Sequence, residues 1–122
     1  MRELLFRGKQ AFNDKWAYSE YPFGTINCGV VTHDFLAETV GQFIGLTDQN
    51  GNKIFEGDII SFERVNALGY TTARVGEVKY YSELPIFYVL ATTGDAWDWV
   101  ECKNIKVIGN IHDNPELLEG VR

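Results

Sequence analysis

Hydrophobic and polar residues alternate with a period of two along much of the chain, as they do in β-strands with one buried face. In the first third of the sequence the alternation covers Leu4–Lys9, Trp16–Tyr18 and Ile26–Val30. The run Tyr21–Gly24 contains a proline and a glycine and predicts a break between strands. Residues Thr32–Thr39 follow neither a strand nor a helix period and are interpreted as a loop.

The pattern is clearer after residue 40, where short apolar runs are separated by turn residues. Asn50-Gly51 and Gly57-Asp58 predict two closely spaced reversals, because glycine and asparagine tolerate the left-handed backbone of a tight turn. Ile54, Ile59 and Ile60 are expected to face the interior. Further strands are predicted at Val40–Leu46, Ile59–Val65, Ala73–Tyr81, Ile86–Ala91, Ala96–Val100 and Ile105–Ile111.

Three segments of this region have more specific patterns. Residues Asn66–Thr72 are interpreted as a loop, and the unbroken apolar run Ile86–Ala91 predicts a central strand covered on both faces. Asn114 and Pro115 begin a segment with the capping residue, proline and acid of a helix start. One short C-terminal helix is therefore expected, ending before Gly120.

These elements predict a mainly β fold whose later strands suit a small, strongly bent barrel. We expect a β-rich N-terminal segment over residues 1–40 and a barrel domain, ending in the short helix, over residues 41–122. A chain of 122 residues is long enough to bury a real core in one domain.

Charge and hydropathy limit where the chain acts and what it binds. The formal net charge of −6 gives no overall attraction to phosphate backbones or anionic lipid, so the charge does not favour nucleic acid as a partner. The sequence holds no apolar run of roughly 20 residues and no signal-peptide core near Met1–Lys9. We therefore expect a protein of the cytoplasm with no membrane partner.

Two groups of residues are of the types that bind metals. Asp48–Asn52 resembles a calcium loop, but its glycine is at the fourth position and Ile59 occupies the twelfth, where a glutamate is required. A hairpin turn is favoured there. The ligand types of a zinc site are supplied by Cys28, His33, Cys102 and His112, whose spacing matches no compact zinc motif.

No metal or cofactor is therefore expected, although whether these four side chains converge stays open. Cysteines in such a chain are usually small buried hydrophobes, and a disulfide between Cys28 and Cys102 is left open.

The carboxylates expected to crowd are Glu56, Asp58, Glu63 and Asp98. Paired carboxylates do acid–base work when their environments separate their pKa values. An acid in a tight turn more often binds backbone N–H groups, which is the favoured interpretation of Asp58. The pairs His33-Asp34 and His112-Asp113 are weaker candidates, because neighbours in sequence seldom face each other in a strand.

Aromatic residues supply the candidate binding surface. Trp97 and Trp99 fall on one face of a predicted strand, and Tyr80, Tyr81 and Tyr88 are expected nearby. Such side chains form platforms on which small barrels bind extended peptides, although core packing is their more common use.

Two longer motifs carry a family resemblance. The runs Gly45–Ile60 and Val107–Leu118, together with Phe6–Lys9 and Thr39–Phe43, closely resemble the YopX family of phage and prophage proteins in order along nearly the whole chain. The resemblance implies a mostly β protein with an SH3-type barrel in its C-terminal part. It implies no established activity and transfers no catalytic residue.

These observations together favour a non-enzymatic accessory protein of a phage or prophage. We expect it to act in the cytoplasm of the bacterial host through protein contacts or self-association as an oligomer. The alternative is a nucleic-acid-associated or DNA-mimicking protein, and a hydrolase using the acidic residues is a third hypothesis.

Overall fold

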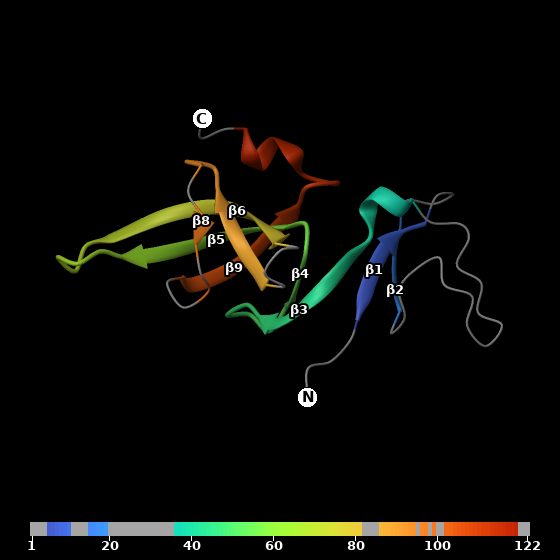
Figure 1. Ribbon diagram of the computed structural model, residues 1–122, viewed down its shortest axis with the longest axis horizontal. Coiled ribbons are helices and arrows are strands. Elements are labelled where there is room, and N and C mark those ends of the chain that lie inside the picture. Colours follow the sequence, from blue (N-terminus) through green and yellow to red (C-terminus); the bar gives the residue numbers. More distant parts are fainter. Residues whose placement is uncertain are drawn as a thin grey trace.

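Antiparallel strands dominate the structure, a computed structural model that describes residues 5–10, 15–19, 36–81, 86–94, 96–97, 99 and 102–119. The mainly β prediction is confirmed (Figure 1). In chain order the elements are β1 (Phe6–Lys9), β2 (Trp16–Ser19), the 3-10 helix η1 (Ala37–Thr39), β3 (Gly41–Thr47), β4 (Lys53–Phe55), β5 (Asp58–Val65), β6 (Thr71–Tyr81), β7 (Ile86–Ala91), β8 (Ala96–Trp97), β9 (Lys103–Asn110) and the 3-10 helix η3 (Pro115–Leu118).

The strands form two sheets. The first has the order β2-β1-β3-β4 and the second the order β8-β7-β6-β5-β9, with every pairing antiparallel. Among the described strands no pairing closes either sheet into a barrel. One reason is that β3 pairs with β1, with Arg7 opposite Gly41, so that its edge is used within the first sheet.

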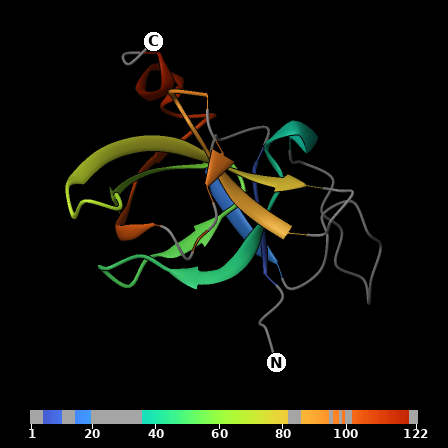
Figure 2. The same ribbon diagram turned by 60° about the vertical axis from the view of Figure 1, so that its left-hand side comes forward.

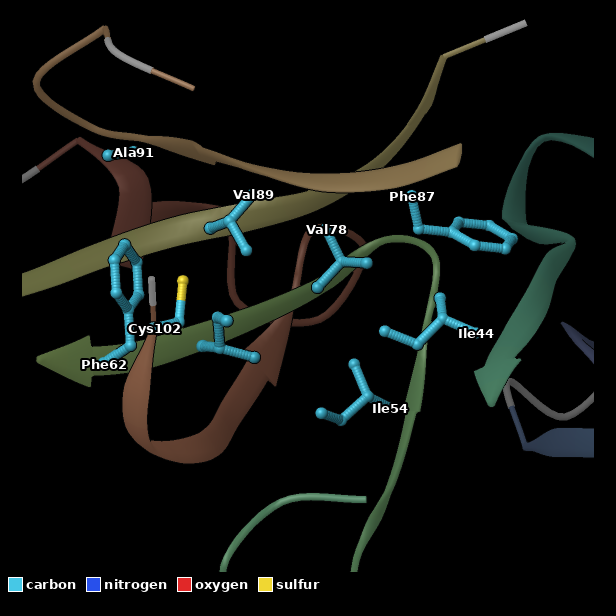
Figure 3. Packing of buried hydrophobic residues seen from close by; sticks show 9 residues of the cluster. Ile44, Ile54, Phe62, Val78, Phe87, Val89, Ala91 and Cys102 are labelled. Atoms are coloured by element: carbon cyan, nitrogen blue, oxygen red, sulfur yellow. The ribbon is translucent and has the colours of Figure 1, made fainter. Parts of the chain in front are cut away.

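One apolar core nevertheless joins the two sheets. Ile44 and Ile54 come from β3 and β4, and they pack against side chains of β5, β6 and β7 (Figure 3). Ile54, Ile59 and Ile60 are fully buried, as expected. The buried members of this shared core are Ile44, Ile54, Ile60, Phe62, Val78, Phe87, Val89, Ala91 and Cys102.

Both predicted reversals are confirmed. Gly51 and Gly57 have φ values of 84° and 91°, a left-handed backbone that side chains with a Cβ rarely adopt. In the first turn the Asp48 carboxylate accepts hydrogen bonds from the backbone N–H groups of Asn50 and Asn52. It also accepts one from Val107 N–H on β9, at 2.9 Å, and so joins this hairpin to the second sheet.

One local prediction was wrong, and another holds only in part. In β7 the buried residues alternate, with Val89 buried and Ile86 exposed, because no second layer of described residues covers its outer face. The C-terminal helix is only the 3-10 turn η3, and Asn114 makes no side-chain cap. Its Oδ1 instead accepts a hydrogen bond from Asn110 N–H at 3.3 Å.

Of the remaining predictions, one differs in its boundary and others stay untested. Strand β6 begins at Thr71, so the loop before it is shorter than expected. The predicted strand at Ile26–Val30 lies outside the described residues. The predicted boundary after residue 40 falls between η1 and β3, while β1 and β3 belong to one sheet.

A buried ion pair connects the first sheet to the second. The Arg7 guanidinium on β1 donates to the carboxylate of Asp58 at the start of β5, and both residues are buried. Phe55 N–H donates to the other Asp58 oxygen at 2.7 Å. The guanidinium lies between the rings of Trp16 and Phe55, at 4.6 and 4.7 Å from their centroids.

Both charges of this pair are removed from water, and this removal determines how the pair affects the pKa of Asp58 and the stability of the fold. Burial raises the pKa of the Asp58 carboxyl, while Arg7 and the Phe55 N–H oppose that rise. A buried charge that loses its partner is strongly unfavourable, so each member of the pair requires the other.

A second, more exposed connection lies beside the first. The Asp113 carboxylate forms an ion pair with Lys9 on β1 and accepts hydrogen bonds from Trp16 Nε1 at 3.0 Å and Asn110 Nδ2 at 3.1 Å. The hydrogen bond from Lys9, with those from Asn110 and Trp16, outweighs burial and lowers the pKa of Asp113 to about 2.

Replacing Arg7 with methionine should destabilise the fold by about 3–5 kcal/mol, because it leaves the buried Asp58 carboxylate without its partner. Urea unfolding followed by circular dichroism measures the change. Lys103→Met, at an exposed position of β9, is the matched control and should change the free energy of unfolding by less than about 0.5 kcal/mol. If the two variants are equally stable, Arg7 is not the required partner of the buried Asp58 carboxylate.

Asp113 should make the stability depend on pH. Its pKa is lowered in the folded state, so its contribution is present above the ordinary value of 3.8 and is lost as the pH falls toward about 2. Asp113→Asn should therefore flatten the fall of unfolding free energy between these pH values. Glu116→Gln, at an exposed position, should leave the slope as in the parent chain.

Candidate functional site

The five aromatic residues predicted as a binding surface do not share one face of the second sheet. Side chains alternate across a strand, and Tyr80 lies on the same side of the sheet as the buried Val78. Tyr88 lies on the opposite side, because it pairs with Lys79. Tyr81 ends β6, and its side chain is outside the described part of the structure.

Trp97 and Trp99 pack against the shared core. Trp99 Nε1 donates to the carbonyl of Phe87 at 3.0 Å, and the Arg64 guanidinium lies 4.1 Å from the centroid of the Trp97 ring. Tyr80, which is 42% exposed, packs its ring on Phe87. Binding of a partner by these five aromatics stays a prediction, while their described contacts belong largely to packing.

A projecting hairpin is the more prominent surface feature. Beyond Glu63 strand β5 has no pairing to β9, and before Val75 strand β6 has none to β7. Residues 64–74, here called the arm, are therefore two-stranded and extend away from the body, on the side opposite β1 and β2 (Figures 1 and 2).

The tip of the arm is held by one asparagine. Asn66 Oδ1 accepts hydrogen bonds from Leu68 N–H at 2.9 Å and Tyr70 N–H at 3.0 Å. Asn66 N–H donates to the carbonyl of Tyr70, and its own carbonyl accepts from Gly69 N–H. With φ of 85°, Gly69 allows the chain to turn back, so the tip has a defined conformation.

Apolar side chains stand exposed on this tip. Leu68 is 82% exposed, Tyr70 68% and Val65 53%. The sequence reasoning missed this surface because it treated residues 66–72 only as a loop. The available signal was an asparagine and a glycine that form a turn around two apolar residues.

A small cleft lies between the two sheets and the C-terminal segment. It encloses about 190 Å³ and is lined by Glu38, Val40, Glu56, Gly57, Glu77, Val78, Lys79, Tyr80, Ile111 and His112. Burial raises the pKa of Glu56, and the neighbouring Glu77 adds to this. Burial, with the nearby Arg7 and Lys9 charges, lowers the pKa of His112.

These shifts favour the protonated carboxyl of Glu56 and the unprotonated imidazole of His112. Such forms can act as a general acid and a general base. Tyr80 is the one described side chain in the cleft that carries a hydroxyl. The cleft therefore has groups that hold or move protons, and no described serine, threonine or cysteine beside them.

The predicted carboxylate cluster is divided among separate contacts. Asp58 is paired with Arg7, Glu56 lines the cleft, and Glu63 accepts a hydrogen bond from Asn104. Asp98 lies outside the described residues. The favoured interpretation of Asp58, an acid that binds a backbone N–H in its turn, is confirmed by its bond from Phe55.

Two of the four possible zinc ligands, Cys102 and His112, lie within the described residues. Cys102 is buried in the shared core, as a small hydrophobe would be, and the His112 ring lies 6.0 Å from that of Trp16. Cys28 and His33 lie outside the described residues, so their position relative to the other two, and a bond between Cys28 and Cys102, stay open. Within the described ranges no three His, Cys, Asp or Glu side chains are placed to hold a metal ion.

The two family-like motifs have architectural roles. Burial opposes ionisation of Asp48, but hydrogen bonds from Val107, Asn52 and Asn50 outweigh it and lower the pKa of its carboxyl. In the second motif Asn110 Oδ1 accepts from the N–H groups of His112 and Asp113. Both motifs therefore position the first sheet and the C-terminal turn against the second sheet.

Among the described helices none has the length and apolarity needed to cross a membrane.

Comparisons with known proteins agree with this architecture. The chain matches a crystal structure of protein EF1440 from Enterococcus faecalis with a TM-score of 0.61 and 22% sequence identity, over 97% of this chain and 99% of that one. That similarity shows a common fold.

Sequence comparison gives the family. No curated protein matches the chain significantly. The model of the YopX protein family matches residues 9–119, which is nearly the whole chain and includes both motifs. The chain therefore belongs to the YopX protein family.

Proposed function

We propose that this YopX-family protein is a non-enzymatic interaction module whose arm binds a protein partner. The observation that carries the proposal is the ordered tip that exposes Leu68, Tyr70 and Val65 to solvent. Exposed apolar side chains gathered at one place mark interaction sites more often than scattered single residues do.

The tip can bind a partner with little loss of conformational entropy. Its backbone is already fixed by Asn66, so little conformational entropy remains to be lost on binding. Burying an exposed Leu or Val side chain stabilises a complex by about 1.5–3 kcal/mol. Tyrosine adds a large apolar ring with a polar end, a combination enriched at interfaces.

The family resemblance is the one support for the proposed cellular setting. We place the protein among accessory proteins of phages and prophages, acting in the cytoplasm of the bacterial host. The fold is proposed to be an opened variant of the SH3-type barrel, supported by the way in which Ile44 and Ile54 from the β3–β4 hairpin complete the core of the second sheet.

Loss of the tip side chains should abolish partner binding without unfolding the protein. The double variant Leu68→Ser, Tyr70→Ser should lose the proteins that cross-link to the parent chain in host cells, as measured by cross-linking and mass spectrometry. The variant should keep the parent's melting temperature within about 4 °C, because neither side chain is buried.

Ile86→Ser is the matched control, since Ile86 is exposed (52%) but lies at the start of β7. It should retain every partner. The proposal fails if the double variant keeps the same cross-linked proteins and the same oligomeric state as the parent chain.

A further inference from the structure

The arm has an open backbone edge as well as an apolar tip. In β6 the N–H and C=O groups of alternate residues point to opposite neighbours. Val75 points away from β5, because its carbonyl accepts from Thr92 N–H, whereas Tyr70 points toward β5 through its bond from Asn66. By this alternation the backbone groups of Thr71 and Ala73 point away from β5.

No described strand lies on that side of Thr71 and Ala73. The pairing of β6 with β7 begins at Gly76, and both Thr71 and Ala73 are exposed. Proteins usually protect such an edge with charged side chains, proline or a bulge. The edge segment Thr71–Arg74 has no proline and no bulge in its pairing with β5. Its one charged residue is Arg74, whose Nη1 donates to the Ala73 carbonyl at 3.1 Å and leaves the second lone pair of that oxygen for another donor.

We infer that this edge pairs with the same edge of a second copy, to form a symmetric antiparallel dimer centred on Thr72. The inference rests on the proposed function and names the partner of the arm. In this register Thr71 of each copy is opposite Ala73 of the other. These residues then exchange both of their backbone hydrogen bonds across the two-fold axis.

The register follows from which groups are available. Centring the pair on Ala73 requires the outward side of Val75, where the backbone of Thr92 already lies and donates its N–H to the Val75 carbonyl. Centring it on Thr71 places Ala73 opposite Gly69, which lies in the turn. Centring it on Thr72 uses the outward groups of Thr71 and Ala73 in both copies.

The pairing of side chains agrees with a second copy as the occupant. The register places Tyr70 of one copy opposite Arg74 of the other, where a guanidinium meets an aromatic ring. Arg74 Nε is buried without a hydrogen-bond partner among the described residues. The two Arg74 residues are about 13 Å apart along the strands, from four residues at about 3.3 Å each, which exceeds the screening length of about 8 Å.

The arm itself carries few charged side chains, although Glu63 lies opposite Ala73 at its base. Within residues 64–74 the charged side chains are Arg64 and Arg74, while the whole chain carries −6. Pairing through the arms therefore brings no carboxylates of residues 64–74 together, while the arginines of the two arms repel one another, a repulsion that salt screens. Tyr70 of each copy lies at the new strand pair, where its exposed ring adds apolar contact.

Sedimentation velocity of the full chain over a concentration series tests the dimer. The parent should dimerise, and Ala73→Pro should raise the dissociation constant about 30-fold, from one lost hydrogen bond per copy. This proline removes an N–H that points away from β5, so the fold should be retained. Ala73→Ser keeps the N–H and should dimerise as the parent does.

A cysteine at the axis tests the register without relying on the proline variant. Directly opposed residues of a non-hydrogen-bonded pair have Cα atoms about 4.5 Å apart, within the range of a disulfide. Thr72→Cys should therefore form a covalent dimer under mild oxidation. Ala73→Cys, one residue away and on the opposite face, should cross-link no more than the parent chain, which already has Cys28 and Cys102.

The inference is overturned if the parent stays monomeric at all concentrations, if Ala73→Pro dimerises as tightly as Ala73→Ser, or if Thr72→Cys cross-links no faster than Ala73→Cys. These results are distinguishable from failure of the proposed function. A monomeric parent whose captured proteins are lost in the Leu68→Ser, Tyr70→Ser variant overturns the dimer and leaves the interaction module standing.

Discussion

The structure depends on the buried ion pair between Arg7 and Asp58. The two residues are far apart in sequence, and they connect β1 of the first sheet to β5 of the second. The aromatic rings of Trp16 and Phe55 exclude water from the guanidinium, which strengthens the attraction and raises the penalty for separating the charges. The pair therefore favours one arrangement of the two sheets over looser ones.

The family motifs surround this pair. Gly57 makes the turn that presents Asp58, Asp48 binds the backbone of β9, and Asp113 reaches back to Lys9 and Trp16. Residues that looked like candidates for chemistry are thus used to hold the sheets together. The arm is outside this network, which leaves its edge and its tip available for contact with another molecule.

Period-two patterns and turn residues were sufficient to predict most strands, the reversals at Gly51 and Gly57, and the burial of Ile54, Ile59 and Ile60. These features depend on neighbours in sequence. The Arg7–Asp58 pair could not be predicted in this way, because an isolated Arg7 has the pattern of a solvated strand residue. The arm was missed because the length of a hairpin beyond its neighbours depends on where β7 and β9 end, which only the sheet register gives.

Native-state hydrogen exchange of the parent chain tests most directly whether the buried pair makes the two sheets one cooperative unit. The account predicts that the most protected amides of β1 and β3 exchange with the same free energy of opening as those of β5, close to that of global unfolding. Exchange of the β1 amides through an opening several kcal/mol lower, while β5 stays protected, would show that the sheets separate independently and would contradict the account.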